Sequence, residues 1–252
     1  MGPGHIAYGR NLAPGHSACD DEASFDKAEG GDEISEPTGA HGGDPHGGRP
    51  PTSHERLAGR PWDASYHDGP PPWDLGRPQP ALVRLADERI FAGVVLDAGC
   101  GTGENALYIA SFGQRVVGVD VAESAVLTAR KKAAARGIRA DFEVADALHL
   151  DRLGREFETV VDCGLFHSFD RGERRDYVTS LASMTSPGGM LYLLCFSDVG
   201  PDTVPHPISR EELTSAFKPG GGWKLASVSP DRLETRMHAH GAPTWLAKIE
   251  RT

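Results

Sequence analysis

A glycine-rich loop is the strongest chemical signal in this sequence. Residues 97–103 read Asp-Ala-Gly-Cys-Gly-Thr-Gly, directly after an apolar run and directly before a helical pattern. Glycines permit a tight turn and let a ligand approach the backbone, while the helix that follows offers its free N–H groups. We therefore expect a ligand site that contains the following loop residues: Asp97, Gly99, Cys100, Gly101 and Gly103.

Two acids follow at the ends of the next two expected strands. Asp120 comes 23 residues after Asp97 (120 minus 97), where doubly wound nucleotide-binding folds place the carboxylate that accepts both ribose hydroxyls. Asp146 is placed to receive an adenine amino group. Because the carboxyl ends of neighbouring parallel strands open into one crevice, the loop and both acids are expected to face the same ligand.

A nicotinamide or flavin dehydrogenase is the competing interpretation of this pattern. Its G-x-G-x-x-G fingerprint would begin at Gly99 and Gly101 but needs a small third residue where this chain has Glu104. An acid beside a pyrophosphate would be repulsive, whereas it is tolerated near a cationic amino group and a sulfonium. The plainest alternative is structural: Asp97 caps a turn and Asp120 is a solvated strand end.

Alternating apolar runs and helical patterns indicate the elements that hold these residues. Strands are expected at 94–97, 115–120, 140–145, 157–163 and 190–196, and helices at 81–90, 104–112, 123–136 and 171–185. Ser209 and Glu212 form a capping-box pattern for a further helix. Residues 223–237 and 243–249 have no helix between them and predict an antiparallel hairpin at a sheet edge. The predicted fold is α/β, a Rossmann-like, seven-stranded, mainly parallel sheet with helices on both faces and a C-terminal antiparallel hairpin.

The chain divides into a tail and a folded domain. Residues 1–60 are rich in Gly, Pro, His and acids and have scarcely a hydrophobic cluster, so we expect them to be disordered. Residues 61–252 form the domain, with an N-terminal cap segment at 61–92 and the sheet core at 93–252. Within the cap, the prolines of 70–80 predict a stiff, extended segment that presents Trp73.

Composition excludes several classes of partner. A formal net charge of -10 argues against binding to a phosphate backbone. No run approaches the roughly 18 apolar residues needed to span a bilayer, and the first 30 residues lack a secretory signal pattern. The four cysteines show neither a disulfide framework nor zinc-ligand spacing. We expect a cytoplasmic protein without a metal, a membrane or a nucleic-acid partner, and the sequence leaves its oligomeric state open.

The motifs together resemble the class I S-adenosylmethionine-dependent methyltransferases. Residues 94–103 match the first motif of that family, and residues 117–120 and 144–147 match the next two. The resemblance spans about 72–249 and implies S-adenosylmethionine as the cofactor. It also adds three expected donor-site residues: Val121, Ala147 and Cys163.

A narrower likeness lies in Pro72–Pro80. This segment looks like the one that precedes the domain in thiopurine S-methyltransferases and in thiol or halide methyltransferases, and similar segments occur in bacterial enzymes that methylate quinolines and phenols. The resemblance implies that Trp73 packs at the donor site. The structural alternative is that Trp73 only anchors the segment to the core.

Residues 162–169 follow the fourth expected strand, where members of this family bring the acceptor to the methyl group. His167 is the candidate base for a phenol or ring N–H, and Asp162 is a candidate for orienting a group near the methyl. An ordinary loop histidine and a strand-end cap are the structural alternatives. A nucleophilic role for Cys163 is disfavoured because methyl transfer requires no covalent intermediate.

Two functions from different classes follow from these residues. The first is methyl transfer to an O, N or S atom of a small, aromatic or heterocyclic molecule, with a thiol or halide acceptor as the variant. The second is a regulatory protein that binds S-adenosylmethionine without turnover.

Overall fold

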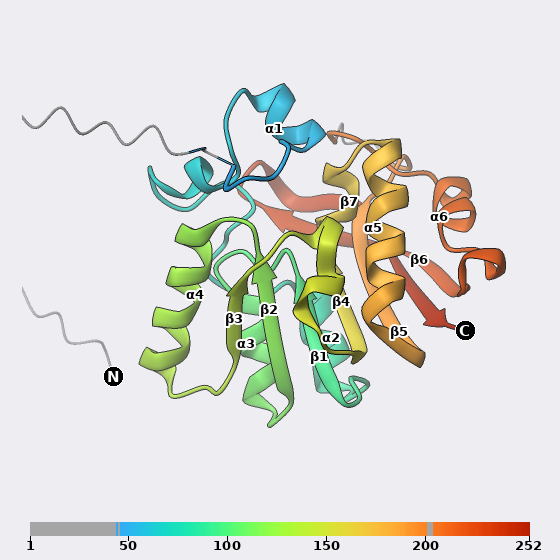
Figure 1. The fold of residues 1–252 in the computed structure, drawn as a ribbon, viewed down its shortest axis with the longest axis horizontal. Coiled ribbons are helices and arrows are strands. Elements are labelled where there is room, and N and C mark those ends of the chain that lie inside the picture. Colours follow the sequence, from blue (N-terminus) through green and yellow to red (C-terminus); the bar gives the residue numbers. More distant parts are fainter. Residues whose placement is uncertain (1–43, 45, 201–203) are drawn as a thin grey trace, which may run out of the picture. The chain divides into compact units, whose positions relative to one another are not determined.

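A seven-stranded sheet forms the centre of the protein in a computed structural model that describes residues 44, 46–200 and 204–252. The strand order is β3-β2-β1-β4-β5-β7-β6, with β7 antiparallel to both neighbours and the other pairs parallel (Figure 1). The strands are β1 Val94–Ala98, β2 Arg115–Asp120, β3 Asp141–Val144, β4 Phe157–Cys163, β5 Thr185–Phe196, β6 Trp223–Thr235 and β7 His238–Arg251. The predicted Rossmann-like sheet and its terminal hairpin are confirmed.

Helices cover both faces of the sheet (Figure 1). They are α1 Ser53–Ala58, α2 Pro80–Asp87, α3 Glu104–Ser111, α4 Glu123–Arg136, α5 Arg171–Met184 and α6 Arg210–Ala216, with short 3-10 segments at Asp63–Tyr66, Ala147–Leu153, Phe166–Ser168 and Pro219–Gly221. Successive strand residues point to opposite faces. Accordingly Val95 belongs to the hydrophobic cluster of α2, α3 and α4, whereas its neighbour Leu96 belongs to that of α5 and α6.

Local sequence signals set the helix ends. The expected capping box of α6 is present, since the Ser209 hydroxyl accepts the Glu212 amide and the Glu212 carboxylate accepts the Ser209 amide. Helix α4 ends at Gly137, whose φ of 63° lies in the left-handed region that favours glycine. One boundary differs, because β5 already begins at Thr185, where residues 186–189 were expected to form a turn.

The expected domain boundary at residue 60 is corrected by the structure. Helix α1 lies within 46–60, where Thr52 and Glu55 form a capping box and Gly59 supplies the left-handed C-cap. The Glu55 carboxylate is buried and binds the Arg49 guanidinium at 2.6 and 2.5 Å. Hydrogen bonding and ion pairing thus hold a segment that has few apolar residues. Residues 1–43 and 45, the larger part of the expected tail, lie outside the described residues.

No helix among the described residues combines the length and the apolar character needed to cross a membrane.

Candidate functional site

A cavity of about 480 Å³ opens where the carboxyl ends of the parallel strands meet. It is lined by eleven of the residues expected in the site: Trp73, Gly99, Cys100, Gly101, Gly103, Asp120, Val121, Asp146, Ala147, Cys163 and His167. Asp97 and Asp162 do not line it. The topology brings these residues together because β3, β2, β1 and β4 are parallel neighbours that end on the same side.

The glycine loop has the conformation that its sequence predicts. Gly99 and Gly103 have φ angles of 71° and 85°, in the left-handed region. A Cβ on Gly103 would lie 2.8 Å from the Ala129 Cβ and 2.9 Å from the Phe142 ring. This third glycine is therefore required for packing of the loop against α4 and β3.

Asp120 combines bonds to the backbone with access to the cavity. Its Oδ2 accepts the Gly101 amide at 2.8 Å, and its Oδ1 accepts the Ala122 amide at 2.9 Å. Burial raises the pKa of Asp120, while these two amides act in the opposite direction. Each carboxylate oxygen has two lone pairs, so both oxygens keep acceptor capacity for a bound hydroxyl.

Like Asp120, Asp146 both binds the backbone and lines the cavity. Its Oδ1 accepts the Leu148 amide at 2.9 Å and so caps the 3-10 segment Ala147–Leu153. The carboxylate nevertheless lines the cavity next to Ala147. A cap and a ligand contact are compatible, because the cap uses only one of the two oxygens.

Asp97 lies behind the cavity wall. It is 1% exposed, and its Oδ2 has no hydrogen-bond partner among the described residues. Burial raises the pKa of Asp97 to about 7, with the Ala106 amide acting in the opposite direction. A buried carboxylate with an unused oxygen is suited to interact with a cationic ligand group in the neighbouring cavity.

Glu104 shows that one step of the sequence reasoning was wrong. Its carboxylate does not present a free negative charge to the cavity, since Lys132 binds it at 2.8 Å and Arg136 at 2.8 and 2.9 Å. Two cations of α4 thus compensate the charge that was expected to repel a pyrophosphate. The charge of Glu104 therefore does not exclude a dinucleotide.

The expected role of Asp162 is also corrected. It was a candidate for orienting reacting groups, but in the structure it shapes the loop. Its Oδ1 accepts the Leu165 amide at 2.9 Å and its Oδ2 accepts the Phe166 amide at 3.1 Å. The side chain is fully buried and outside the cavity lining. Asp162 therefore positions the turn that carries His167.

His167 is buried and lines the cavity after the end of β4. Its Nδ1 accepts the Phe196 amide at 3.3 Å, and its ring stacks on the Phe196 ring with centroids 4.0 Å apart. Burial lowers the pKa of His167 to about 3, and the nearby Arg174 charge acts in the same direction. The imidazole is therefore neutral at physiological pH.

The N-terminal segment supplies residues that sequence reasoning missed. Thr52, His54, Trp62 and Tyr66 all line the cavity. The first two come from the stretch that was expected to be disordered, and the other two from the expected cap segment. Glu55 anchors this cover, because its carboxylate accepts the Thr52 amide at 2.8 Å and the Trp62 amide at 2.9 Å. The Thr52-x-x-Glu55 spacing of a capping box is the signal that identifies it.

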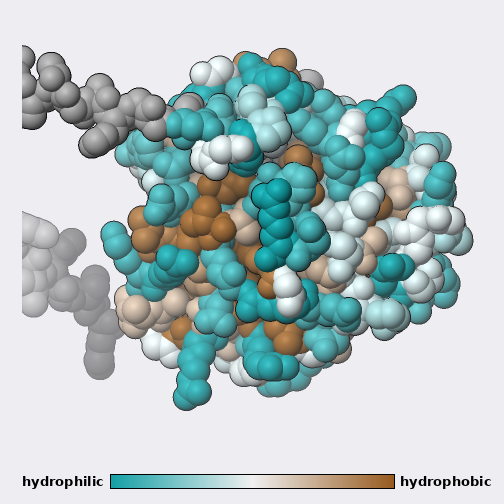
Figure 2. All heavy atoms as spheres, viewed as in Figure 1, coloured by the Kyte–Doolittle hydropathy of each residue, from teal (hydrophilic) through white to brown (hydrophobic). Residues whose placement is uncertain are grey.

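Aromatic rings build the cover. His54 and Trp62 stack with centroids 4.1 Å apart and planes 8° apart, and Trp73 packs edge-on to Trp62 at 5.7 Å. The Trp73 Nε1 also donates to the Tyr66 hydroxyl at 3.3 Å. Trp73 therefore lines the cavity and anchors its own segment at the same time. On the face shown in Figure 2, hydrophobic side chains gather beneath the segment that carries α1.

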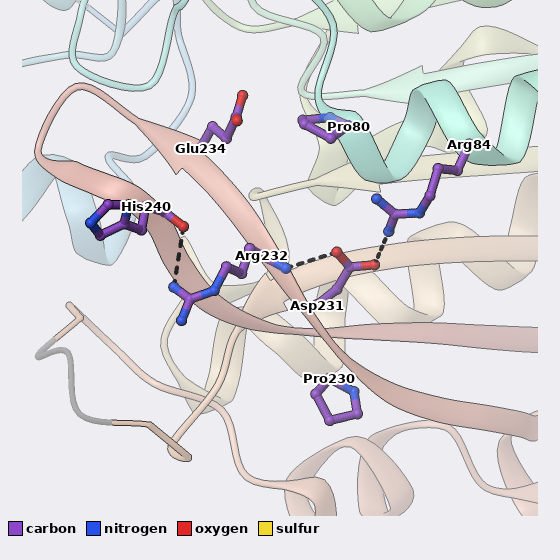
Figure 3. A pocket seen from close by; sticks show the side chains of 7 residues that line it. All are labelled: Pro80, Arg84, Pro230, Asp231, Arg232, Glu234 and His240. Atoms are coloured by element: carbon purple, nitrogen blue, oxygen red, sulfur yellow. Dashed lines mark hydrogen bonds and ion pairs between the residues drawn. The ribbon is translucent and has the colours of Figure 1, made fainter.

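A second hollow of about 450 Å³ lies between α2 and the β6–β7 hairpin (Figure 3). Arg84, Asp231 and Arg232 bind one another or the backbone, and Glu234 pairs with Arg77 outside the hollow at 2.5 Å. Asp231 pairs with Arg84, and the Arg232 Nη1 donates to the His240 carbonyl at 3.2 Å. The ion pair fastens the hairpin to α2, and the hollow contains none of the glycine-loop or strand-end residues of the first cavity.

Comparison with known proteins gives a consistent result. The family described as "Methyltransferase domain" matches residues 95–189. A protein of Mycobacteroides abscessus, named 2-heptyl-1-hydroxyquinolin-4(1H)-one methyltransferase, is 37% identical over 167 residues, which cover 65% of this chain and 73% of the relative. Probable thiol methyltransferase 2 of Arabidopsis thaliana is 29% identical over 163 residues, which cover 64% of this chain and 72% of the relative.

A solved structure agrees with these relatives. It is described as "Conversion of a Disulfide Bond into a Thioacetal Group during Echinomycin Biosynthesis" and is 35% identical to this chain with a TM-score of 0.68. The match covers 75% of this chain and 90% of that one.

Proposed function

Because this chain belongs to the class I S-adenosylmethionine-dependent methyltransferases, we propose that it methylates a hydroxyl oxygen of a flat heterocycle with an apolar substituent. Family membership makes the chain an enzyme that uses S-adenosylmethionine and acts on a small molecule. The atom methylated and the acceptor class are the proposed part. The aromatic lining of the cavity carries this proposal.

The residues of the first cavity fit the donor. Asp120 and Asp146 offer carboxylate oxygens to a ribose and an adenine amino group, and the unpaired Oδ2 of Asp97 suits the neighbourhood of an ammonium group. When bound, S-adenosylmethionine supplies an electrophilic methyl group: the oxygen–carbon bond forms as the carbon–sulfur bond breaks, and its electron pair stays on sulfur. The protein's part is to align the acceptor and exclude water.

The acceptor end of the cavity is lined by rings. His167 is stacked on Phe196, and both line the cavity together with Phe169 and Trp62. Flat aromatic ligands gain both area burial and ring contacts in such surroundings. The relative from Mycobacteroides abscessus is named for a hydroxylated quinolone, which supports a similar acceptor here.

The mouth of the cavity supports an apolar substituent. Leu57 and Met237 line the cavity although they are 74% and 60% exposed. They come from α1 and from the turn between β6 and β7, so two elements that are distant in the sequence contribute to one apolar rim. An alkyl chain on the acceptor would cover these side chains from water.

A panel of acceptors with labelled S-adenosylmethionine tests the proposal. We expect turnover of 1-hydroxyquinolin-4-ones and a lower KM for a heptyl-substituted one than for the unsubstituted one. The variant Leu57→Ser should raise the KM of the heptyl compound by about 3- to 10-fold, because up to about 1.4 kcal/mol of apolar contact is lost. The unsubstituted compound serves as the control and should keep its KM.

Other outcomes of this panel would contradict the proposal. Turnover of thiols or iodide alone would assign a sulfur or halide acceptor, in line with the Arabidopsis thaliana relative. Donor binding without turnover of any acceptor would favour a regulatory protein. An equal effect of Leu57→Ser on both quinolones would remove the rim from the acceptor site.

We also propose a cytoplasmic enzyme that has no nucleic-acid partner, with residues 1–43 as a tail outside the catalytic domain. The formal net charge of -10 argues against a nucleic-acid partner, because a surface that binds nucleic acid is ordinarily basic. The free thiols of Cys100, Cys163 and Cys195 suit a reducing compartment. The composition of the tail supports the last part of this proposal.

A further inference from the structure

One hydrogen bond fixes which nitrogen of His167 carries its proton. The Phe196 amide donates to Nδ1 at 3.3 Å, so Nδ1 is the unprotonated nitrogen of the ring. A neutral imidazole has one N–H, which must then be at Nε2. Stacking on Phe196 holds the ring plane in place. His167 therefore presents a donor and not a lone pair at the nitrogen that is left for a ligand.

The charges around His167 oppose its use as a proton acceptor. The groups whose charges act on the ring are Arg174 of α5, His206 of the loop after β5 and His54 of α1, and each of them disfavours the protonated imidazole. Among the described residues no carboxylate bonds to the ring, and the Asp162 carboxylate is occupied by the Leu165 and Phe166 amides. An imidazolium formed during catalysis would lack a counter-ion.

The polar groups of the cavity are divided along the sheet edge. Its strand-end carboxylates are Asp120, the last residue of β2, and Asp146, which follows β3. The three cavity histidines lie at the other end: His167 after β4, His206 after β5 and His54 above them on α1. The strand-end carboxylates thus lie at the end of the cavity proposed for the cationic donor, while the end proposed for the acceptor has the Nε2–H group of His167 and two further imidazoles. This end of the cavity favours an anionic ligand.

We propose that the acceptor enters already ionised and that His167 holds its oxygen with the Nε2–H group instead of removing a proton. This inference rests on the proposed function. The acceptor loses its proton to water before it binds, so no proton moves to the enzyme during methyl transfer. The acceptor class is therefore acidic hydroxyl compounds, such as N-hydroxy heterocycles and electron-poor phenols.

The pH dependence separates the two roles of His167. We expect kcat/KM to rise with pH up to the solution pKa of the acceptor. For two 1-hydroxyquinolin-4-ones whose solution pKa values differ by about two units, the inflection of the pH profile should therefore differ by about two pH units. A histidine base acting on a neutral acceptor predicts a different profile: kcat/KM rises with an inflection at the pKa of the histidine, which is the same for both acceptors, and decreases above the pKa of each acceptor. That result would overturn the proposal.

A spectroscopic measurement tests the same point without turnover. Hydroxyquinolones and nitrophenols change their ultraviolet absorption when they ionise. In the complex with S-adenosylhomocysteine, the acceptor should show the anion spectrum at a pH about one unit below its solution pKa, since a hydrogen bond to a charged group favours the ionised form by that order. A neutral spectrum in the complex would contradict the proposal.

Two variants of His167 give a matched comparison. In His167→Gln, the side-chain oxygen is able to accept the Phe196 amide while the amide NH₂ donates to the acceptor; His167→Phe keeps a ring of similar size without a donor. We expect His167→Phe to lower kcat/KM by about 10- to 100-fold and to lose the anion spectrum, and His167→Gln to remain within about tenfold of wild type. Equal losses of about 10²- to 10⁴-fold in both variants would assign a base.

The controls distinguish this inference from the proposed function. The exposed His149 lies outside the cavity lining, so His149→Gln should leave the pH profile unchanged. Calorimetric affinity for S-adenosylmethionine reports whether each variant is folded at the donor site. If wild type binds the donor but methylates no hydroxyl compound, the proposed function fails; if it methylates them with a fixed inflection, only the role of His167 fails.

Discussion

At the residue scale, burial gives three aspartates at the ends of parallel strands different surroundings and different partners. Asp120 faces the cavity, Asp162 is used by loop amides, and Asp97 is enclosed with one unpaired oxygen. Burial raises the pKa of Asp97 to about 7 and that of Asp162 to about 6. In the absence of a ligand, ionisation of these two groups therefore opposes folding.

The variant Asp97→Asn tests this cost. An unfolded aspartate has a pKa near 3.9, so between about pH 4 and pH 7 the unfolded chain releases a proton that the fold retains, and this group lowers stability as pH rises. At about 1.4 kcal/mol per pKa unit, the upper bound of the effect is about 4 kcal/mol. We expect Asp97→Asn to be more stable than wild type at pH 8 by about 1 to 4 kcal/mol.

Denaturant unfolding from pH 4 to pH 8 measures that difference. The gap between variant and wild type should grow with pH up to about 7 and then level off. The exposed Asp141 is the matched control, because Asp141→Asn should show no such gap. A constant gap across this range would mean that Asp97 ionises at its ordinary pKa. Weaker donor binding by the same variant is expected if Asp97 serves the ammonium group.

At the element scale, the N-terminal segment forms a cover held by polar contacts. Glu55 binds Arg49 and accepts the Thr52 and Trp62 amides, and α1 bonds to the start of α5 through Ser53, whose amide donates to Glu173 at 2.6 Å. Such a cover has little apolar area in its anchor. It is therefore expected to open at a lower free energy than the sheet.

The variant Glu55→Gln tests the anchor. Loss of the charged hydrogen bonds should lower the free energy of opening this segment by about 1 to 3 kcal/mol, because Arg49 and two amides lose a charged acceptor. We expect faster amide hydrogen exchange in residues 46–66 and a 3- to 10-fold higher KM for the donor, with little change in the melting temperature of the sheet. The exposed Glu211 of α6 supplies the control variant Glu211→Gln. Unchanged exchange in 46–66 would show that apolar packing alone holds the cover.

At the scale of the whole molecule, donor binding should stabilise the fold. A ligand that binds only the native state at 100 times its Kd adds about 2.7 kcal/mol, which raises the melting temperature of a domain of this size by roughly 5 to 10 °C. Calorimetric melts with S-adenosylmethionine and with S-adenosylhomocysteine measure this shift.

The variant Asp120→Ala is compared with wild type in the same melting experiment. It removes the acceptor for the ribose hydroxyls, and we expect its donor affinity to fall about 10- to 100-fold and about half or more of the shift to disappear at the same concentration. A wild-type protein without any shift would contradict the donor site as a whole. An undiminished shift in Asp120→Ala would contradict only the ribose assignment.

The sequence by itself determined the sheet, the glycine loop and the strand-end acids. These features depend on local rules: apolar runs set the strands, glycines set the turn, and parallel strands bring their carboxyl ends together. Asp120 and Asp146 were placed in the cavity on that basis and Trp73 through the family resemblance, and all three line it.

Only the tertiary structure decided which groups face the cavity and which protonation state each of them has. Helix α1 was missed because its stability comes from contacts with residues such as Arg49 and Glu173, which are not visible in its composition. The burial of Asp97, the compensation of Glu104 by α4 and the bond from Phe196 to His167 all join residues that are distant in the sequence. Protonation and donor direction depend on such neighbours, so they follow from the fold and not from local sequence.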